Sequence, residues 1–271
     1  MREILEASLK EITKLLRDFL VTESIASQKG VLQSIDARVK LVSLFILVFF
    51  VAISDSPPIS FFIIFLSFLL AVLSKIPLRA YAARVTLIPA FSFVVVLPWA
   101  FLTEGAPLLN LPLGLKITHE GMFYVTNFTA RVFACVSLLV LLILTTRFSS
   151  LLSAMRALRL PSGFVSVLAI AYRYMFLFLN EVYRLLVARE SRTFKHEKLR
   201  KTWRLGGETL GVFFLRALER GERVHLAAVA RGYSAEVKTY TRETQLKPKD
   251  FLFLLLSLLL SATVILHGVR I

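Results

Sequence analysis

Five long apolar stretches limit what this chain can fold into more than any other feature. They cover residues 41–54, 59–74, 85–102, 122–146 and 251–268. A helix that crosses a bilayer needs about 20 predominantly apolar residues. Hydrophobic residues make up 56% of the chain, whereas soluble globular proteins hold roughly 45–50%. We therefore predict an all-α membrane protein with about five transmembrane helices.

The basic side chains predict which loops face the cytoplasm, because Lys and Arg are enriched in short cytoplasmic loops. The loop at Asp55 has neither, the loop at 75–84 has three such residues, and the loop at 104–121 has one. Residues 147–250 carry 20 basic and 9 acidic side chains. The loops agree with a multi-pass protein of the cell (plasma) membrane whose N-terminus is cytoplasmic and whose C-terminus lies outside.

Residues 161–187 are apolar enough to be considered as a sixth transmembrane helix. Arg173 lies near their middle, and a charge at a helix centre costs about 2.5–3.5 kcal/mol on insertion scales. A sixth crossing would also place residues 184–249, with 16 basic side chains, outside. We therefore interpret residues 161–194 as a long, largely apolar helix that lies along the cytoplasmic side of the membrane.

These patterns divide the chain into four segments. The first is predicted to form an amphipathic helix, because Leu5, Leu9, Ile12, Leu16 and Phe19 recur at helical spacing. The segments are an N-terminal amphipathic helix at 1–37, four transmembrane helices at 38–146, a cytoplasmic segment with two long helices at 147–250, and a last transmembrane helix at 251–271.

The second long helix of the cytoplasmic segment has a predicted apolar face and a charged one. Glycine is favoured just after a helix end, so this helix is expected to end at Gly232. The stretch "RLGGETLG" (204–211) is expected to let the helix start or cross a neighbour closely. The apolar face consists of Leu210, Phe214, Leu218, Gly221 and Val224.

Two arginines end the two cytoplasmic helices in a similar way. Ala188 lies four residues before Arg192, and Ala227 lies four residues before Arg231. Residues i and i+4 share one helix face, so each arginine projects beside a small residue. Arginine is always charged and binds carboxylates through two parallel hydrogen bonds. The alternative is that the helix dipole alone favours a cation there, by roughly 0.3–1 kcal/mol.

Three stretches together resemble one family, over roughly residues 35–267. They are "DARVKL" (36–41), the run from 156 to 192 with its Tyr-Arg-Tyr and following Glu181, and "AAVARG" (227–232). The ordered set resembles the transmembrane T component of energy-coupling factor (ECF) transporters, most closely the cobalt-type CbiQ branch.

The resemblance implies a four-part importer in which this chain is the energy-coupling subunit. Two ABC-type ATPases hydrolyse ATP, and a substrate-binding S component in the membrane captures the nutrient. The T component joins them through two coupling helices, which lie between its fourth and fifth spans and insert arginine motifs into the ATPases. The implied motifs are Ser191-Arg192-Thr193 and Ala230-Arg231-Gly232, supported by Ala188, Ala227 and Glu181.

The first motif departs from the family pattern, which often reads Ala-Arg-Gly. Here it reads Ser-Arg-Thr, and Ala188-Arg189-Glu190 precedes it, so Arg189 remains an alternative to Arg192. The resemblance favours cobalt or nickel uptake. A vitamin importer of the same type and a stand-alone membrane transporter remain the alternatives.

Arg131 lies near the middle of the fourth apolar stretch, where a charge is a functional candidate by default. None of the five apolar stretches contains an acidic residue. Asn127 or backbone carbonyls are therefore the expected partners. A structural role is weighed against contact with the S component.

The motifs of several other protein classes are absent from the sequence. It has neither a GxxxxGK[ST] loop nor an HExxH pair, and Cys135 is its one cysteine. We therefore expect no enzyme activity, no catalytic residues, no metal site and no cofactor. The net charge of +15 could suggest nucleic acid, but the basic block is interleaved with apolar runs, so the expected partner is the lipid bilayer.

Overall fold

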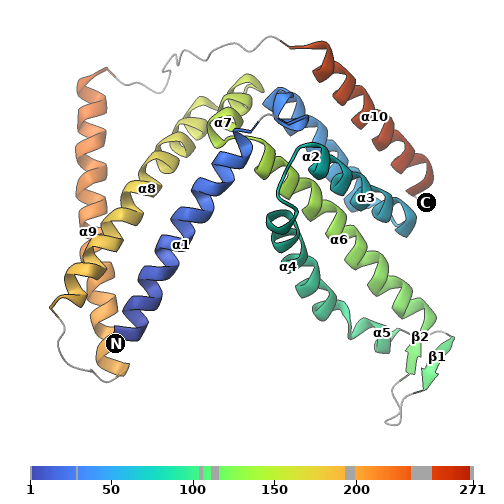
Figure 1. The fold of residues 1–271 in the computed structure, drawn as a ribbon, viewed down its shortest axis with the longest axis horizontal. Coiled ribbons are helices and arrows are strands. Elements are labelled where there is room, and N and C mark those ends of the chain that lie inside the picture. Colours follow the sequence, from blue (N-terminus) through green and yellow to red (C-terminus); the bar gives the residue numbers. More distant parts are fainter. Residues whose placement is uncertain are drawn as a thin grey trace. The chain divides into compact units, whose positions relative to one another are not determined.

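The computed structural model describes residues 2–28, 30–103, 106–110, 116–192, 199–232 and 246–268. Almost all of them are helical, so the predicted α-helical membrane fold is confirmed (Figure 1). The helices are α1 (Arg2–Ala26), α2 (Ala37–Ile53), α3 (Pro57–Leu73), α4 (Leu78–Val96), α5 (Trp99–Leu102), α6 (His119–Thr145), α7 (Phe148–Ala157), α8 (Ser162–Glu190), α9 (Leu199–Ala230) and α10 (Pro248–Gly268), with a 3-10 turn at Leu32–Ser34.

A short pair of strands lies within the loop predicted at 104–121. There β1 (Pro107–Asn110) pairs with β2 (Lys116–Thr118) as an antiparallel hairpin. The hairpin leads directly into α6, because the Thr118 hydroxyl accepts a hydrogen bond from the Gly121 N–H and caps the helix.

The chain forms two compact units. The first holds Met1–Thr22 and Met155–Arg242, and therefore most of α1 with α8 and α9. The second holds Glu23–Ala154 and Glu243–Ile271, and therefore α2 to α6 with α10. The division into four segments at 37, 146 and 250 stays a prediction.

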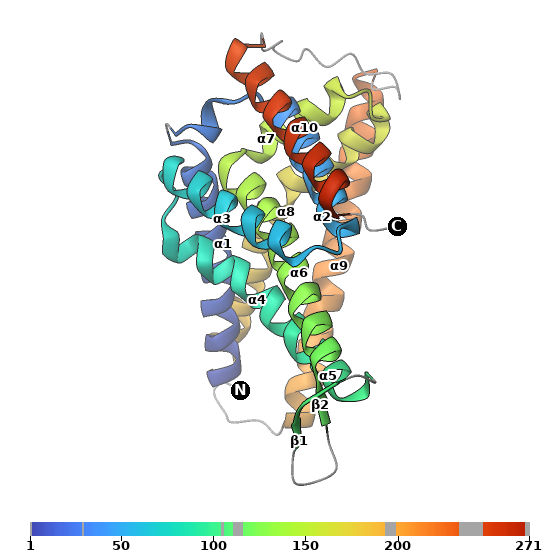
Figure 2. The ribbon, with the colours of Figure 1, turned by 90° about the vertical axis from the view of Figure 1, so that its right-hand side faces the viewer.

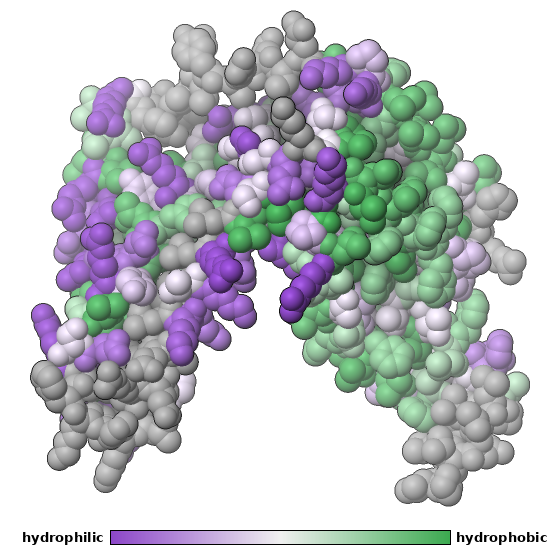
Figure 3. Space-filling model, in the orientation of Figure 1, coloured by the Kyte–Doolittle hydropathy of each residue, from purple (hydrophilic) through white to green (hydrophobic). Residues whose placement is uncertain are grey.

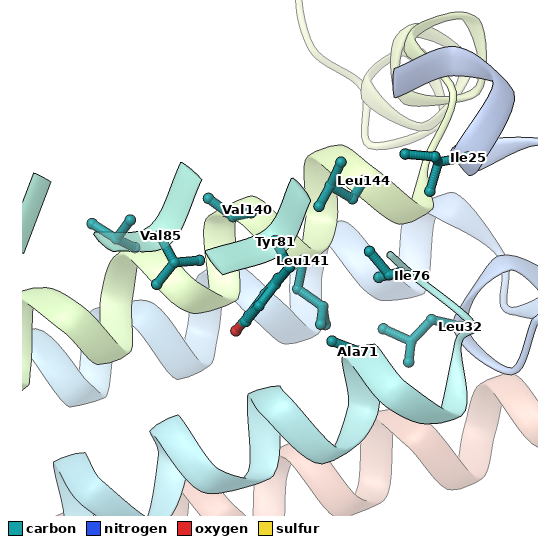
Figure 4. Packing of buried hydrophobic residues seen from close by; sticks show 10 residues of the cluster. Ile25, Leu32, Ala71, Ile76, Tyr81, Val85, Val140, Leu141 and Leu144 are labelled. Atoms are coloured by element: carbon teal, nitrogen blue, oxygen red, sulfur yellow. The ribbon is translucent and has the colours of Figure 1, made fainter. Parts of the chain in front are cut away.

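Helix α6 is the centre of the second unit. It packs against α2, α3, α4 and α5, while α10 lies along α2 (Figure 2). Two groups of buried apolar side chains fill these contacts. One group is Ile25, Leu32, Ala71, Ile76, Tyr81, Val85, Val136, Val140, Leu141 and Leu144 (Figure 4); the other is Leu44, Leu47, Val51, Ile63, Ala134, Leu138, Leu142 and Val264.

The outer surface of the second unit is apolar where a water-soluble protein would be polar (Figure 3). Phe65 and Phe91 are 65% and 71% exposed. Four helices are long and apolar enough to cross a membrane, namely α4 with α5, α6, α8 and α10, and α3 is apolar but shorter. The protein is therefore a multi-pass membrane protein. The count of five crossings stays a prediction, because α8 also has the length and composition to cross.

The third apolar stretch is interrupted near its end. Helix α4 begins at Leu78, passes through Pro89 and ends at Val96, and α5 restarts at Trp99. Pro98 lies between the two helices, and proline has no N–H to continue the helical hydrogen bonds. The predicted span at 85–102 is therefore two helices, and the first begins seven residues earlier than predicted.

Small polar side chains join the helices inside the second unit. The Ser67 Oγ lies 3.0 Å from the Tyr81 hydroxyl and 3.0 Å from the Ser137 Oγ, which links α3, α4 and α6. Serine lets helix backbones approach closely, and its hydroxyl finds a partner on the neighbouring helix. These contacts fix the mutual orientation of three helices in surroundings where hydrophobic burial alone does not favour association.

A buried polar junction holds α2, α6 and α10 together at one end. Lys40 and Asp250 are each 2% exposed. The Asp250 carboxylate accepts from the Asp36 N–H at 2.8 Å and from the Lys247 N–H at 2.7 Å. The Lys40 Nζ donates to the Thr145 carbonyl at 2.9 Å, at the C-terminus of α6. The start of "DARVKL" therefore caps α2 and anchors two other helices to it.

Removing the Asp250 carboxylate is expected to loosen this junction. Asp250→Ala leaves two backbone N–H groups without their acceptor and Lys40 without one of its two neighbouring carboxylates. Both N–H groups are part-buried, so each costs about 1 kcal/mol when left without its acceptor, and the midpoint of thermal unfolding in detergent should fall by roughly 4–8 °C. Lys249→Ala, which changes an exposed neighbour in the same turn, should leave the midpoint unchanged. An unchanged midpoint for Asp250→Ala would contradict the assigned role.

Candidate functional site

Helices α8 and α9 are the two longest helices of the first unit and run antiparallel. Three contacts define their register: the ring of Phe178 meets the edge of Phe213 at 5.7 Å, Glu181 pairs with Arg216 at 2.8 Å, and the Arg189 guanidinium donates to the Leu205 carbonyl. The contact nearest the end of α8, at Arg189, falls nearest the start of α9, and the two contacts farther back on α8 fall farther along α9. The end of α8 therefore lies beside the start of α9 (Figure 1).

The antiparallel register places the two candidate arginine motifs at opposite ends of this helix pair. Arg192 follows α8 directly, and Arg231 follows α9 directly. Helix α9 has 32 residues, so at 1.5 Å per residue it is about 48 Å long. Because Arg189 contacts Leu205 near the start of α9, most of this length separates the two motifs.

The residues of both motifs that the structure describes are accessible. Arg192 and Arg231 are exposed, as are Ser191, Ala230 and Gly232 and the preceding Ala188 and Ala227. Among the described residues, neither guanidinium has a hydrogen bond or an ion pair. Thr193 lies outside the described residues. Each described motif therefore presents a cation beside a small side chain, as the sequence pattern indicated.

The backbone at the second motif follows the expected form. The Arg231 and Gly232 N–H groups donate to the Ala228 and Val229 carbonyls, and Gly232 has a φ of +73°. Glycine reaches this left-handed region without the cost that a side chain would bring. Gly232 therefore ends α9 sharply and leaves Arg231 at the helix end.

Two other residues noted in the sequence have internal roles in the first unit. Glu181 accepts a hydrogen bond from Arg216 and so links α8 to α9. Arg189, the alternative coupling arginine, is half-buried and donates to the Leu205 carbonyl across the same contact. The sequence did not indicate either pairing, because the partners are 35 and 16 residues apart and no local pattern joins them.

The contact face of α9 differs from the predicted apolar face. The half-buried positions are Leu205, Thr209, Phe213, Ala217, Arg220, Val224 and Ala228, which recur every three or four residues. Of the predicted face, Leu210 and Phe214 are 62% and 63% exposed. The stretch "RLGGETLG" lies inside α9. A Cβ at Gly206, Gly207 or Gly211 would meet nothing within 4 Å, so these glycines do not serve a close approach to a described neighbour.

Arg131 in the second unit has an acidic partner that the sequence analysis missed. Its guanidinium pairs with the Asp55 carboxylate and donates to the Ala52 carbonyl at 3.4 Å. The Asn127 amide donates to the Asp55 carbonyl at 2.8 Å. Asp55 lies outside the apolar stretches, in the loop between α2 and α3, so its place in the sequence does not indicate the pairing. These contacts fasten that loop to α6.

Metal coordination has no evident site in the part of the chain that the structure describes. Those residues contain no cluster of three or more His, Cys, Asp or Glu side chains that could hold an ion. The first unit presents two kinds of exposed feature that a partner protein could bind: the arginine motifs, and the apolar side chains of α8 and α9.

Comparisons with known proteins agree on one family. The sequence model of the CbiQ family, described as cobalt transport protein, matches residues 28–241. An uncharacterized protein of Methanocaldococcus jannaschii is 34% identical, covering 97% of this chain and 92% of its own. The cobalt transport protein CbiQ of Rhodobacter capsulatus is 28% identical, covering 72% and 76%. The energy-coupling factor transporter transmembrane protein EcfT of Staphylococcus aureus is 26% identical, covering 79% and 83%.

Reversing one charge of the ion pair between α8 and α9 is expected to loosen their contact. Arg216→Glu would face Glu181 with a like charge, and an exposed pair of this kind contributes roughly 0.2–1 kcal/mol. Hydrogen exchange of the α8 amides around residue 181 should become faster, and the swap Glu181→Arg/Arg216→Glu should restore it.

Arg223→Glu is the matched control, because it reverses an arginine of α9 whose contacts are with Glu219 of the same helix. It should leave exchange in α8 unchanged. Equal acceleration by both single changes would show that charge on α9, rather than the pair, sets the exchange rate.

Proposed function

Because the chain belongs to the CbiQ family of cobalt transport proteins, we propose that it is the transmembrane coupling subunit of an energy-coupling factor importer. In this proposal the chain hydrolyses nothing itself. It joins two ABC-type ATPases at the cytoplasmic face of the cell membrane to a substrate-binding S component within it. The names of the CbiQ and EcfT relatives support this assignment.

The separation of Arg192 and Arg231 is the observation that carries the proposal. Two exposed arginines at opposite ends of one rigid helix pair fit two separate binding pockets better than one shared pocket. In the proposed complex each ATPase receives one motif, Ser191-Arg192-Thr193 or Ala230-Arg231-Gly232. A buried acidic group in each ATPase would accept the guanidinium through two parallel hydrogen bonds.

Arg192 is the better candidate for the first coupling arginine than Arg189. The Arg189 guanidinium is engaged with the Leu205 carbonyl between α8 and α9. Arg192 is exposed just beyond the end of α8, with Ala188 one turn before it. Arg189 would have to give up its contact with α9 to reach a partner, whereas Arg192 would not.

The apolar sides of α8 and α9 are the proposed contact with the S component. A helix side with large exposed apolar residues indicates a surface that another protein or lipid covers. Closure of the ATPase dimer on ATP would move the two arginines, and the stiff helix pair would carry this movement to the S component. The exposed side chains are Phe164, Val167 and Ile170 on α8 and Leu210, Phe214 and Leu218 on α9.

Cobalt is the substrate that we propose for the complete importer, on the basis of the family description and the CbiQ relative. The ion would be bound by the S component rather than by this chain. Uptake of Co²⁺ into vesicles that contain the whole complex, with Ni²⁺ as competitor, tests this assignment. Uptake of neither ion would favour another nutrient.

The coupling role is tested by co-expression of the tagged chain with its ATPases and purification in detergent. Arg192→Glu/Arg231→Glu should lose both ATPases, because breaking a buried charge pair costs about 2–5 kcal/mol, or roughly 30-fold or more in affinity. Each single change should retain one ATPase and lose the other. Arg189→Glu should loosen α8 from α9 without removing an ATPase selectively.

Arg204→Glu/Arg223→Glu is the matched control, since it makes the same change in net charge at two exposed positions within α9. It should retain both ATPases. Retention of both ATPases by Arg192→Glu/Arg231→Glu would overturn the role of the arginines. Absence of ATPases from the wild-type purification would favour a stand-alone membrane transporter.

A further inference from the structure

Helix α1 is an element that the family match does not include. The match begins at residue 28, whereas α1 covers Arg2–Ala26. The alignment with the Methanocaldococcus jannaschii relative covers 97% of this chain. The unaligned remainder is shorter than the 25 residues of α1, so the alignment includes at least part of this helix. That protein and this chain therefore share an N-terminal region that the family model does not cover, and this region needs its own explanation.

Phe19 of α1 packs against two aromatic rings of α8. Its ring centroid lies 4.8 Å from that of Phe176, edge to face, and 5.7 Å from that of Tyr172. Tyr172 and Phe176 also meet edge to face at 5.6 Å, so the three rings form one cluster. Tilted and edge-to-face pairs at these separations are the favourable arrangements for aromatic side chains.

The polar side of α1 faces away from this cluster. Lys10, Glu11, Lys14 and Arg17 are exposed, whereas Phe19 is half-buried. Helix α1 runs beside α8 and opposite to it in direction (Figure 1). Phe19 is the one position of the predicted apolar repeat whose side chain the structure describes, and it lies on α8 as an amphipathic helix requires.

The rings of α1 and α9 meet α8 on different sides. Phe176 contacts α1 and Phe178 contacts α9. Residues two apart on a helix point in nearly opposite directions. A helix held along one side can roll about that line of contact, and contact on a second side prevents the roll. Because Arg192 stands at the end of α8, a roll of α8 would change the direction of its guanidinium.

We propose that α1 braces the first coupling helix and that Phe19 is a positioning residue for Arg192. This inference rests on the proposed coupling function and adds a third helix to the pair that the family resemblance implies. Phe19 touches neither ATPase nor substrate in this proposal. It acts by keeping α8 in the orientation in which Arg192 fits its ATPase.

The test is the dependence of Phe19→Ala on the two arginines, measured as the ATPase retained by the tagged complex through a salt wash. In the wild-type background Phe19→Ala should reduce retention of one ATPase by roughly threefold to tenfold, the effect of losing an aromatic pair. In the Arg231→Glu background it should reduce retention further by a similar factor. In the Arg192→Glu background it should add nothing, because the arginine through which it acts is already lost.

A general loss of stability would lower retention in all three backgrounds and would overturn the positioning role. Phe19→Tyr keeps the ring and should restore retention, whereas Phe176→Ala should reproduce the Phe19→Ala pattern. Phe91→Ala, at an exposed phenylalanine of α4, is the matched control and should change nothing.

The two proposals fail in different ways in this experiment. If the wild-type chain retains both ATPases and adding Phe19→Ala changes retention in none of the three backgrounds, the positioning role of Phe19 is wrong and the coupling role stands. If the wild-type chain retains none, the coupling role fails before Phe19 is considered.

Discussion

The antiparallel contact between α8 and α9 determines what the first unit can do. Both arginine motifs stand at helix C-termini, so a parallel pair would place them side by side. The antiparallel pair places them at opposite ends of a helix about 48 Å long. The ring contact of Phe178 with Phe213 and the ion pair of Glu181 with Arg216 maintain this arrangement. The residues of this helix contact thereby set the distance between Arg192 and Arg231, although they are not themselves proposed to touch an ATPase.

Local patterns in the sequence were sufficient for most helices and for their ends. The helix expected at 161–194 is α8, Ser162–Glu190, and the helix expected to end at Gly232 is α9, which ends at Ala230. Apolar periodicity and terminal glycine act within a few residues, so they can be read without the fold. The interruption at Pro98 was missed although the proline that causes it stands in the sequence, and the hairpin before α6 was missed because its short strands pair only with each other.

Long-range pairings could not be read in the same way. The bond between Asp250 and the Asp36 N–H joins residues 214 apart, and nothing near either residue identifies the other. Helix α9 carries apolar side chains on more than one side, and the rings of α8 select the side with Phe213 rather than the predicted Phe214. The two arginines were identified from a repeated local pattern, the resemblance assigned the motifs around them, and their role as coupling motifs stays a prediction.

The polar junction at Asp250 also bears on how the chain is made. Ribosomes deliver α2 long before α10, yet Asp250 of α10 supplies the carboxylate that receives the Asp36 N–H beside Lys40. Until α10 has been synthesised, a lysine at the start of an apolar helix lacks one of its two neighbouring carboxylates. The second unit is therefore completed only after the last helix has been synthesised, so the order of synthesis delays the final packing at the start of α2.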